Sequence, residues 1–339
     1  MIISEGVTIA RDGQPIIIAE GGVNHFGDVG EALRLADMAR STDCDVFKLQ
    51  HYNVDNLIHP SNIYWKKRLK TKQLNIIELC KVKQHCDDIG IPFMCTGHDE
   101  QSLQELIDYE LIRVIKVGSG ELRNFPYLNF ARSFRMPIIL STGMYSIRDI
   151  IETVSELSRT GFTDLALMHC ITAYPIERSR VNLHIINKLK SIINFPVGWS
   201  DHTVGNEICI AAVMAGADFI EKHITIQKDV PDAQDWKVSA DEQDLSRLVG
   251  GVRDVWIAKN SREEKPLTEE LDGKSWALKK AFYKSNLKAG HSLSNEDILM
   301  MRAGENGSLL GSDVIKLLNK RLIVDVTCYD EIDYSHFSD

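Results

Sequence analysis

The chain lacks several features that would define its class at once. Its 339 residues contain no CxxC pair, no basic excess and no apolar stretch long enough to cross a membrane. The longest mainly apolar stretch, residues 208–220, is too short and too interrupted for a transmembrane helix. The N-terminus has no basic segment followed by an apolar one, so we expect no signal peptide. We therefore expect a cytoplasmic protein with no membrane partner.

The balance of charge is acidic. Asp and Glu number 48 against 39 Lys and Arg, which gives a net charge of -9 and a pI of about 5.7. Nucleic-acid binding requires a basic face, so we expect no nucleic-acid partner. An anionic small substrate is still allowed, because local lysines can outweigh the net charge. Several of the seven cysteines lie in apolar runs, as small core residues do, which indicates a reduced compartment.

Short apolar runs recur along the first 225 residues. They occupy residues 15–20, 45–50, 91–96, 113–119, 137–142, 165–170, 196–201 and 218–225. Most are almost continuously apolar, which is typical of strands buried on both faces. Helical patterns lie between them, for example at 31–41 and 147–161. Eight such units in about 250 residues predict a (β/α)8 TIM barrel, and a doubly wound open sheet is the alternative.

The texture of the sequence changes after a helical pattern at 241–258. Residues 259–275 are charged and polar, as in a linker, and residues 276–339 hold short apolar runs broken by turns. We predict a barrel domain over 1–258, a linker over 259–275 and a small, mostly β domain over 276–339. A domain of about 60 residues is marginal for an independent core, so we expect it to dock on another surface.

Residues 51–72 are long for a βα loop and are interpreted as a lid. The segment carries a basic run that either attracts anions or forms a solvated face. Its role is left open.

Polar residues stand at the carboxyl ends of all eight apolar runs, where a barrel enzyme places its chemistry. Strand ends can be polar simply because they meet water, but the recurrence on every run favours an active site. The set is Glu20, Lys48, Gln50, Thr96, Lys116, Ser119, Ser141, Thr142, His169, Thr172, Tyr174, Ser200, His202, Glu221 and His223.

Lys48 and Lys116 have apolar neighbours near the ends of their runs. Each could bind a phosphate or carboxylate as a cation, form a Schiff base after burial lowers its pKa, or simply extend to the rim. Nearby serines favour an anion-binding cradle. The glycines after Lys116 also let backbone N–H groups approach an oxyanion.

His202 and His223 lie 21 residues apart, each near the end of a predicted strand. Two imidazoles on neighbouring parallel strands can share one metal ion, although either alone could be a hydrogen-bonded structural residue. No cysteine accompanies them, so the pair suits Mn²⁺ or a similar octahedral ion better than zinc. Glu20 is a candidate general acid or base, or the partner of a rim lysine.

Seven short motifs occur in order along the predicted barrel. They are IIAEGGVNHFGD (17–28), KLQ (48–50), KVGSGE (116–121), PIILSTGM (137–144), HCITAYP (169–175), WSDHTVGNE (199–207) and IEKHIT (220–225). Each alone is weak, but together they make the chain resemble the sialic acid synthases, which condense phosphoenolpyruvate with an N-acetylated hexose. Residues 276–339 resemble the antifreeze-like (SAF) domain of these synthases, through NLKAGHSLSNEDI (286–298) and MRAGENG (301–307).

The resemblance implies a role for each matching residue. The residues expected to bind phosphoenolpyruvate are Lys48, Lys116, Ser119, Ser141, Thr172 and Ser200. His202 and His223 are expected to hold a divalent metal, Mn²⁺ or Mg²⁺, and to be catalytic together with Glu20. The residues expected to face the acetamido sugar are Glu20, Gln50, Tyr174 and Asp235. Arg302, with Trp276 nearby, is expected to reach the acceptor of the partner subunit in a domain-swapped homodimer.

The chain also departs from the family pattern. Thr96-Gly97-His98 stands where the family often has a threonine-proline-aromatic turn, and Ala303 follows the arginine where proline is usual. In PDAQDWKVS (231–239), Asp232 and Asp235 are alternatives for one acceptor contact. We expect these changes to lie around the acceptor. They leave open N-acetylmannosamine, a di-acetamido precursor of legionaminic or pseudaminic acid, or a less usual sugar.

Two other functions remain open on the residues alone. A Schiff-base pyruvate aldolase or lyase on the same barrel would use Lys48 or Lys116 as its nucleophile, without metal or phosphoenolpyruvate. A non-catalytic sugar-binding or ice-binding protein is suggested only by residues 276–339, and it would have little use for the predicted cradle and histidine pair.

Overall fold

The computed structural model describes residues 1–4, 6–159, 161–230, 235–261, 263 and 265–338. The chain divides into two compact units, Met1–Asn260 and Ser261–Asp339, which are described separately. Across the described residues, no helix has the length and apolar character to cross a membrane.

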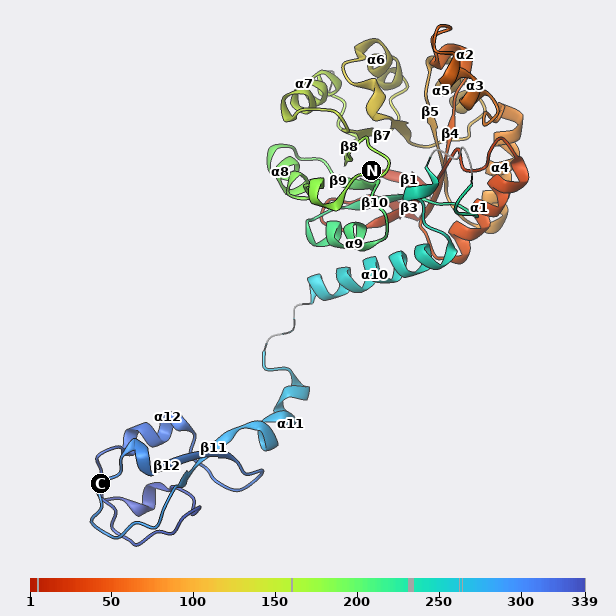
Figure 1. Cartoon of the computed structure of the whole chain (residues 1–339). Helices are drawn as coiled ribbons and strands as arrows, with labels where there is room; N and C mark the ends of the chain where they lie inside the picture. The colour runs from red at the N-terminus through yellow and green to blue at the C-terminus, as the bar shows by residue number, and fades with distance from the viewer. Residues whose placement is uncertain (5, 160, 231–234, 262, 264, 339) are drawn as a thin grey trace. The chain divides into compact units, whose positions relative to one another are not determined.

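The first unit is a barrel of parallel strands surrounded by helices (Figure 1). The strands are β3 (Ile16–Gly22), β4 (Val46–His51), β5 (Phe93–Gly97), β6 (Ile115–Val117), β7 (Ile138–Ser141), β8 (Leu165–His169), β9 (Val197–Asp201) and β10 (Phe219–His223). Their hydrogen-bonded order is β5-β4-β3-β10-β9-β8-β7-β6, and β5 and β6 at the two ends contact each other. This order follows the chain around a ring, which confirms the predicted barrel and excludes a doubly wound sheet.

Helices follow the strands, and most of them cover the outside of the ring (Figure 1). They are α1 (Val29–Ser41), α2 (Val54–Leu57), α3 (Ile63–Lys70), α4 (Ile76–Ile89), α5 (Glu100–Asp108), α6 (Phe125–Ser133), α7 (Ile147–Ser158), α8 (His184–Ile192), α9 (Glu207–Met214) and α10 (Glu242–Asn260). Local signals set their ends: Asn75 and Glu78 form a capping box at the start of α4, and Gly90 ends α4 in the left-handed conformation.

The interior of the barrel is apolar at its amino end. Inward residues such as Ile18, Val46 and Phe219 form one cluster with Ile3 and Ile9 of an N-terminal hairpin, β1 (Ile2–Ser4) and β2 (Val7–Thr8). Side chains two residues apart share one face of a strand, so each next inward residue lies toward the carboxyl end. There the interior turns polar, with Glu20, Lys48 and Glu221 following these three apolar residues by two positions each. The alternation therefore stacks an apolar layer beneath a polar one.

The predicted lid is a folded segment that contains α2 and α3. The Tyr52 hydroxyl donates to the carbonyl of Leu69 at 3.0 Å, and Tyr52 packs with Val23 and Val54 in a small cluster. In the basic run, Lys66 pairs with Asp55. The segment is thus anchored to β3 and β4 by apolar contacts.

The second unit contains α11 (Thr268–Ala277), β11 (Lys279–Tyr283), β12 (Ile298–Arg302) and α12 (Gly311–Val314). β11 and β12 pair antiparallel, and Tyr283, Leu293 and Leu317 belong to a core of its own. Helix α11 occupies much of the range interpreted as a linker. Short 3₁₀ turns complete the two units: η1 (Ser119–Glu121), η2 (Arg178–Arg180), η3 (Trp236–Val238), η4 (Asn295–Asp297), η5 (Ile315–Leu317) and η6 (Tyr334–His336).

Candidate active site

A cavity of about 220 Å³ lies at the carboxyl end of the barrel strands. Its lining contains nearly all of the barrel residues to which the sequence assigns a role. The lining residues are Glu20, Lys48, Gln50, Thr96, His98, Lys116, Gly118, Ser119, Gly120, Ser141, Cys170, Thr172, Tyr174, Ser200, His202, Glu221 and His223. Asp235 is not in the lining, but its Oδ2 lies 3.9 Å from Nδ1 of His223. Asp232 falls outside the described residues, and Trp276 and Arg302 belong to the second unit.

Lys48 lies between two buried carboxylates contributed by other strands. Its Nζ forms an ion pair with Glu20 and donates to Oε2 of Glu221 at 2.6 Å, while Oε1 of Glu221 accepts from the Ser200 hydroxyl at 2.8 Å. Burial acts to lower the pKa of Lys48, but the two carboxylates outweigh it and the net pKa is raised. Lys48 is therefore a fixed cation, which disfavours it as a Schiff-base nucleophile.

The pKa values of the two glutamates shift in opposite directions. Burial and the neighbouring Glu221 charge raise the pKa of Glu20. Burial also acts to raise the pKa of Glu221, but Lys48 and Lys116 outweigh it and the net pKa falls below the usual range. Two carboxylates held close to one lysine separate into a weaker acid and a stronger one. Glu20 is thus the weaker acid of the two.

Lys116 is a buried cation in a different setting. Its Nζ donates to the Ser141 hydroxyl at 2.6 Å, and no carboxylate lies within ion-pair distance of it in the described part of the chain. Burial and the charge of Lys48 lower its pKa. A buried ammonium group without a paired carboxylate gains most from an incoming anion.

The wall beside Lys116 is closely packed around Gly143. The Gly143 N–H donates to the Ser119 hydroxyl at 2.9 Å, and Ser119 Oγ lies 3.2 Å from Sγ of Cys170. A Cβ at Gly143 would lie 2.3 Å from Oγ1 of Thr172. Only glycine allows the ends of β6, β7 and β8 to approach this closely.

The two histidines face each other at the ends of β9 and β10. Their ring centroids are 5.6 Å apart, and the Tyr174 ring stacks on His202 with a centroid distance of 3.9 Å. Nδ1 of His202 donates to the carbonyl of Ile171 at 2.6 Å, so Nε2 carries the lone pair of the ring and lies 3.5 Å from the Ser200 hydroxyl. Nδ1 of His223 is buried and has no hydrogen-bond partner among the described residues.

Both imidazoles have a lowered pKa. Burial lowers the pKa of His202, and burial lowers the pKa of His223 to about 4. They are therefore neutral near pH 7, the form that binds metals. The lone pairs on these two neutral rings fit a divalent ion. No set of three His, Cys, Asp or Glu side chains arranged for metal binding occurs among the described residues, so its other ligands would be water or substrate oxygens.

A second buried ion pair lies on the outer face of β9 and β10. Lys222 Nζ donates to Oδ2 of Asp201 at 2.7 Å and to the carbonyls of Thr203 and Gly205 at 2.8 and 2.9 Å. Asp201 and Lys222 immediately precede the two histidines in the sequence. The pair therefore fixes both strand ends and the loop after His202.

Sequence reasoning assigned no role to Glu221, His98 or Cys170, which also line the cavity. The sequence does contain a signal for Glu221, which is polar, lies near the end of an apolar run and precedes His223 by two residues on the same face of the strand. His98 was expected on the acceptor side, but its ring is next to Gly118, beside the residues expected to bind the donor. The path of the chain after β5 decides the position of the His98 ring, and the local sequence pattern does not predict that path.

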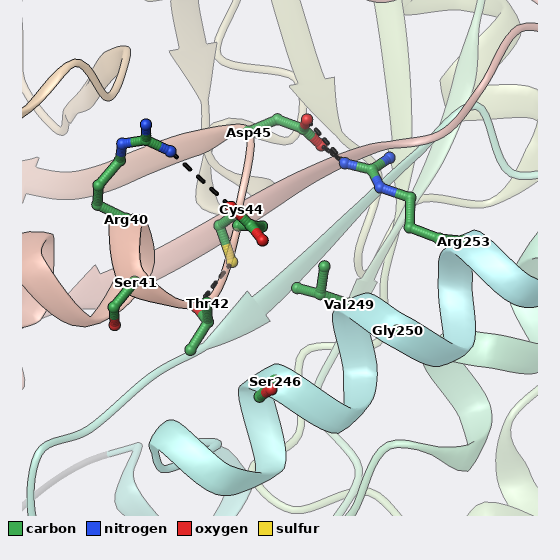
Figure 2. A pocket seen from close by; sticks show the side chains of 10 residues that line it. Arg40, Ser41, Thr42, Cys44, Asp45, Ser246, Val249, Gly250 and Arg253 are labelled. Carbon is green, nitrogen blue, oxygen red and sulfur yellow. Dashed lines mark hydrogen bonds and ion pairs between the residues drawn. The ribbon is translucent and has the colours of Figure 1, made fainter.

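A larger hollow lies elsewhere on the barrel, between the end of α1 and α10 (Figure 2). It measures about 620 Å³. Its arginines are already paired: Arg253 contacts both carboxylate oxygens of Asp45, and Arg40 lies 3.9 Å from Asp43. Because these charges are satisfied internally, the hollow offers less to an anion than the cavity around Lys116 does.

These features are those of a barrel enzyme with an anion-binding site. Comparison with known proteins agrees. The NeuB family model matches residues 35–264. An N,N'-diacetyllegionaminic acid synthase of Legionella pneumophila is 32% identical over 337 residues, which cover 94% of each chain. The human N-acetylneuraminate-9-phosphate synthase is 30% identical over 329 residues, covering 93% of this chain and 90% of the relative.

The fold agrees as well. The crystal structure of an N-acetylneuraminic acid (sialic acid) synthetase from Leptospira borgpetersenii matches with a TM-score of 0.72 at 30% identity and covers 77% of this chain and 90% of that one. The chain belongs to the NeuB family. It is an enzyme, a transferase that forms a carbon–carbon bond. The assignment of residues 276–339 to a SAF domain stays a prediction.

Proposed function

We propose that this enzyme condenses phosphoenolpyruvate with an N-acetylated hexose to give a nine-carbon sialic-acid-type sugar and phosphate. The observation that carries the proposal is one cavity lined by two neutral imidazoles and by Lys116, a buried cation with no carboxylate partner in the described part of the chain. The names of the relatives support the acetamido-sugar class of acceptor. N-acetylmannosamine and di-acetamido sugars are the candidates within that class.

The proposed donor site is the cradle formed by Lys48, Lys116, Ser119, Ser141, Thr172 and Ser200. Lys116 would neutralise part of the phosphate or carboxylate charge, and the hydroxyl groups would donate to its oxygens. Lys48 keeps its charge through Glu20 and Glu221, so it adds a fixed positive potential to the cradle. The cradle thus orients C3 of the donor toward the acceptor carbonyl.

His202 and His223 would hold Mn²⁺ or Mg²⁺, which when bound supplies a Lewis acid for the acceptor carbonyl. In the reaction, C3 of phosphoenolpyruvate bonds to that carbonyl carbon, water adds at C2, and the resulting tetrahedral centre expels phosphate. Glu20, the weaker acid of the two glutamates, would exchange the proton with water or with the new hydroxyl.

The acceptor would lie against Gln50, Tyr174 and Asp235. Tyr174 and Asp235 flank the histidine pair, which places them next to the proposed reaction centre. Arg302 and Trp276 would complete this site from the partner subunit of a homodimer. Within the second unit, the Arg302 guanidinium lies over the Trp276 ring at 5.6 Å. The pair thus forms one feature that could contact a sugar.

The second candidate is a Schiff-base pyruvate aldolase or lyase. The lowered pKa of Lys116, caused by burial and by Lys48, is the observation that favours it. The two roles of Lys116 can be told apart, because a lysine that attacks pyruvate forms a covalent imine and a lysine that binds phosphate as a cation does not. Borohydride trapping with pyruvate would leave a stable adduct on Lys116 only in the second case.

The test is phosphate release from phosphoenolpyruvate with a panel of acetamido sugars. We expect release with one class of sugar, its loss after chelation, and its recovery with Mn²⁺ or Mg²⁺. His223→Ala should lose turnover while the protein remains folded. Full activity of that variant after chelation would refute the metal assignment, and a borohydride adduct without phosphate release would favour the aldolase.

A further inference from the structure

His98 occupies a position in the cavity wall that the family pattern does not explain. It follows β5 directly, and its backbone N–H donates to the carbonyl of His51 at 2.9 Å. The next residue, Asp99, caps α5 through the Ser102 N–H at 3.0 Å and also accepts from the Asn53 N–H at 2.9 Å. The backbone at His98 is therefore held firmly between a strand and a helix.

The imidazole of His98 points toward the donor cradle. A Cβ built on Gly118 would lie 3.6 Å from Cε1 and 3.9 Å from Nδ1 of His98, so the ring packs against the chain that links Lys116 to Ser119. On its other side, the Tyr52 ring lies at a centroid distance of 6.4 Å in an edge-on arrangement. The ring thus lies between the lid and the cradle.

Neither ring nitrogen of His98 has a hydrogen-bond partner among the described residues. Two other histidines of the barrel each have one: Nε2 of His51 contacts Glu105 at 2.9 Å, and Nδ1 of His25 accepts from the Gly27 N–H at 3.0 Å. A polar ring that lines a cavity without a partner is suited to a ligand.

The charges around His98 are mostly positive. Burial, together with Lys48, Lys116 and His51, lowers the pKa of His98 to about 4, whereas Asp99 acts to raise it. In the free enzyme the ring is therefore neutral near pH 7. An anion bound between the two lysines would reverse this balance, because it favours a protonated ring.

We propose that His98 is a donor-binding residue of this enzyme, which takes up a proton when phosphoenolpyruvate binds and donates to its phosphate or carboxylate as an imidazolium. This proposal rests on the proposed function and adds a residue that the family pattern does not supply. An aromatic hydrocarbon at this position could fill the same space but could not donate.

The sign of the pH dependence follows from the direction of the shift. The pKa of His98 is higher in the donor complex than in the free enzyme, so its contribution to affinity is present below the complex pKa. The contribution is lost as the pH rises through that value. Donor affinity should therefore fall as the pH is raised above neutrality, and more steeply with His98 than without it.

The experiment uses the full-length protein and phosphoenolpyruvate alone, without acceptor. Titration calorimetry in buffers of different ionisation enthalpy gives the dissociation constant and the number of protons taken up. His98→Gln keeps a polar side chain that cannot ionise, and His98→Phe keeps an aromatic ring of the family type. For both variants we expect a dissociation constant for phosphoenolpyruvate that is roughly tenfold higher, or more, near neutral pH. We also expect fewer protons to be taken up on binding than in the natural protein.

His169→Gln is the matched control. His169 also stands at a strand end with a pKa that burial lowers to about 4, but it packs against Trp199 and does not line the cavity. This variant should keep the donor affinity and the proton uptake of the natural protein. Thermal unfolding of all three variants would confirm that they are folded. Because phenylalanine and glutamine differ in volume and shape, we expect at least one of the two His98 variants to fold.

The outcomes separate the two proposals. Equal affinity for the natural protein and both His98 variants would overturn the role of His98 and leave the proposed function intact. Weaker binding with unchanged proton uptake would also overturn it, since the imidazolium would then play no part. If phosphoenolpyruvate does not bind the natural protein at all, the proposed function and this inference both fail.

Discussion

At the residue scale, the two cavity lysines show how the surroundings of identical side chains change their pKa and their ion pairs. Lys48 is paired with Glu20 and Glu221, whereas the Lys116 ammonium group donates to the Ser141 hydroxyl and forms no ion pair within the described residues. Removing Lys48 leaves two buried carboxylates close together without their ion-pair partner, but among the described residues no carboxylate loses its ion-pair partner when Lys116 is removed. Their variants should therefore differ in stability even where both weaken donor binding.

We predict that Lys116→Met keeps or raises the melting temperature and weakens phosphoenolpyruvate binding. Loss of one charge-assisted contact corresponds to roughly 1.5–3 kcal/mol of binding free energy. Lys48→Met should weaken binding and also lower the melting temperature, because the unpaired carboxylates are destabilised. Calorimetric donor binding and thermal unfolding measure both effects. Unchanged donor affinity in Lys116→Met would contradict the proposed cradle.

At the element scale, strands β9 and β10 carry a buried ion pair at each end. Lys222 and Asp201 join the carboxyl ends beside the two histidines. At the amino ends, Lys190 from α8 pairs with Asp218 at 2.7 Å, and Asp218 also accepts from the Val197 N–H at 2.8 Å. The pair at the amino ends is thus a control for the pair at the carboxyl ends, because only the latter lies beside the two histidines.

We predict that Lys222→Met lowers both stability and metal affinity. Leaving Asp201 buried without its partner should cost about 3–5 kcal/mol of unfolding free energy. Loss of support for the residues next to both histidines should weaken Mn²⁺ binding by about 10–100-fold. Lys190→Met should lower the melting temperature and leave Mn²⁺ affinity unchanged. Electron paramagnetic resonance titration of free Mn²⁺ measures the affinity, and equal losses in the two variants would argue against a positioning role.

At the scale of the whole molecule, each unit has a core of its own. The apolar clusters of the barrel end with α10, and the cluster of the second unit begins at Ala281. A chain that ends at Asn260 should therefore fold, bind phosphoenolpyruvate and turn over poorly, because it lacks Arg302. Thermal unfolding, donor binding and phosphate release measure the three properties. Normal turnover would show that the second unit takes no part in catalysis.

A second prediction at this scale concerns the proposed homodimer. Arg302→Ala and His202→Ala chains should each be inactive alone but partly active after subunit exchange. Each hybrid dimer would then hold one site with both residues intact. The measurement is phosphate release, with subunit exchange followed on differently tagged chains. Absence of recovery despite exchange would place the arginine in its own chain's site or outside catalysis.

The fold could be predicted from the sequence because its signals are local. Each strand is a short apolar run, and each boundary is set by neighbouring residues such as Asn75, Glu78 and Gly90. The period of two along a strand also indicated which polar residues enter the interior. The N-terminal hairpin was missed, because its few apolar residues gain meaning only when they pack against the amino end of the barrel.

The sequence by itself determined the eight parallel strands and the polar residues at their carboxyl ends, since strand formation and side-chain alternation depend on near neighbours. Only the tertiary structure decided which of these residues meet. Closure of the ring and the register between strands place Lys48 between Glu20 and Glu221, bring Lys116 to the Ser141 hydroxyl and turn His98 toward Gly118. These distances are set by strands far apart in the chain, and the charge of each group follows from them.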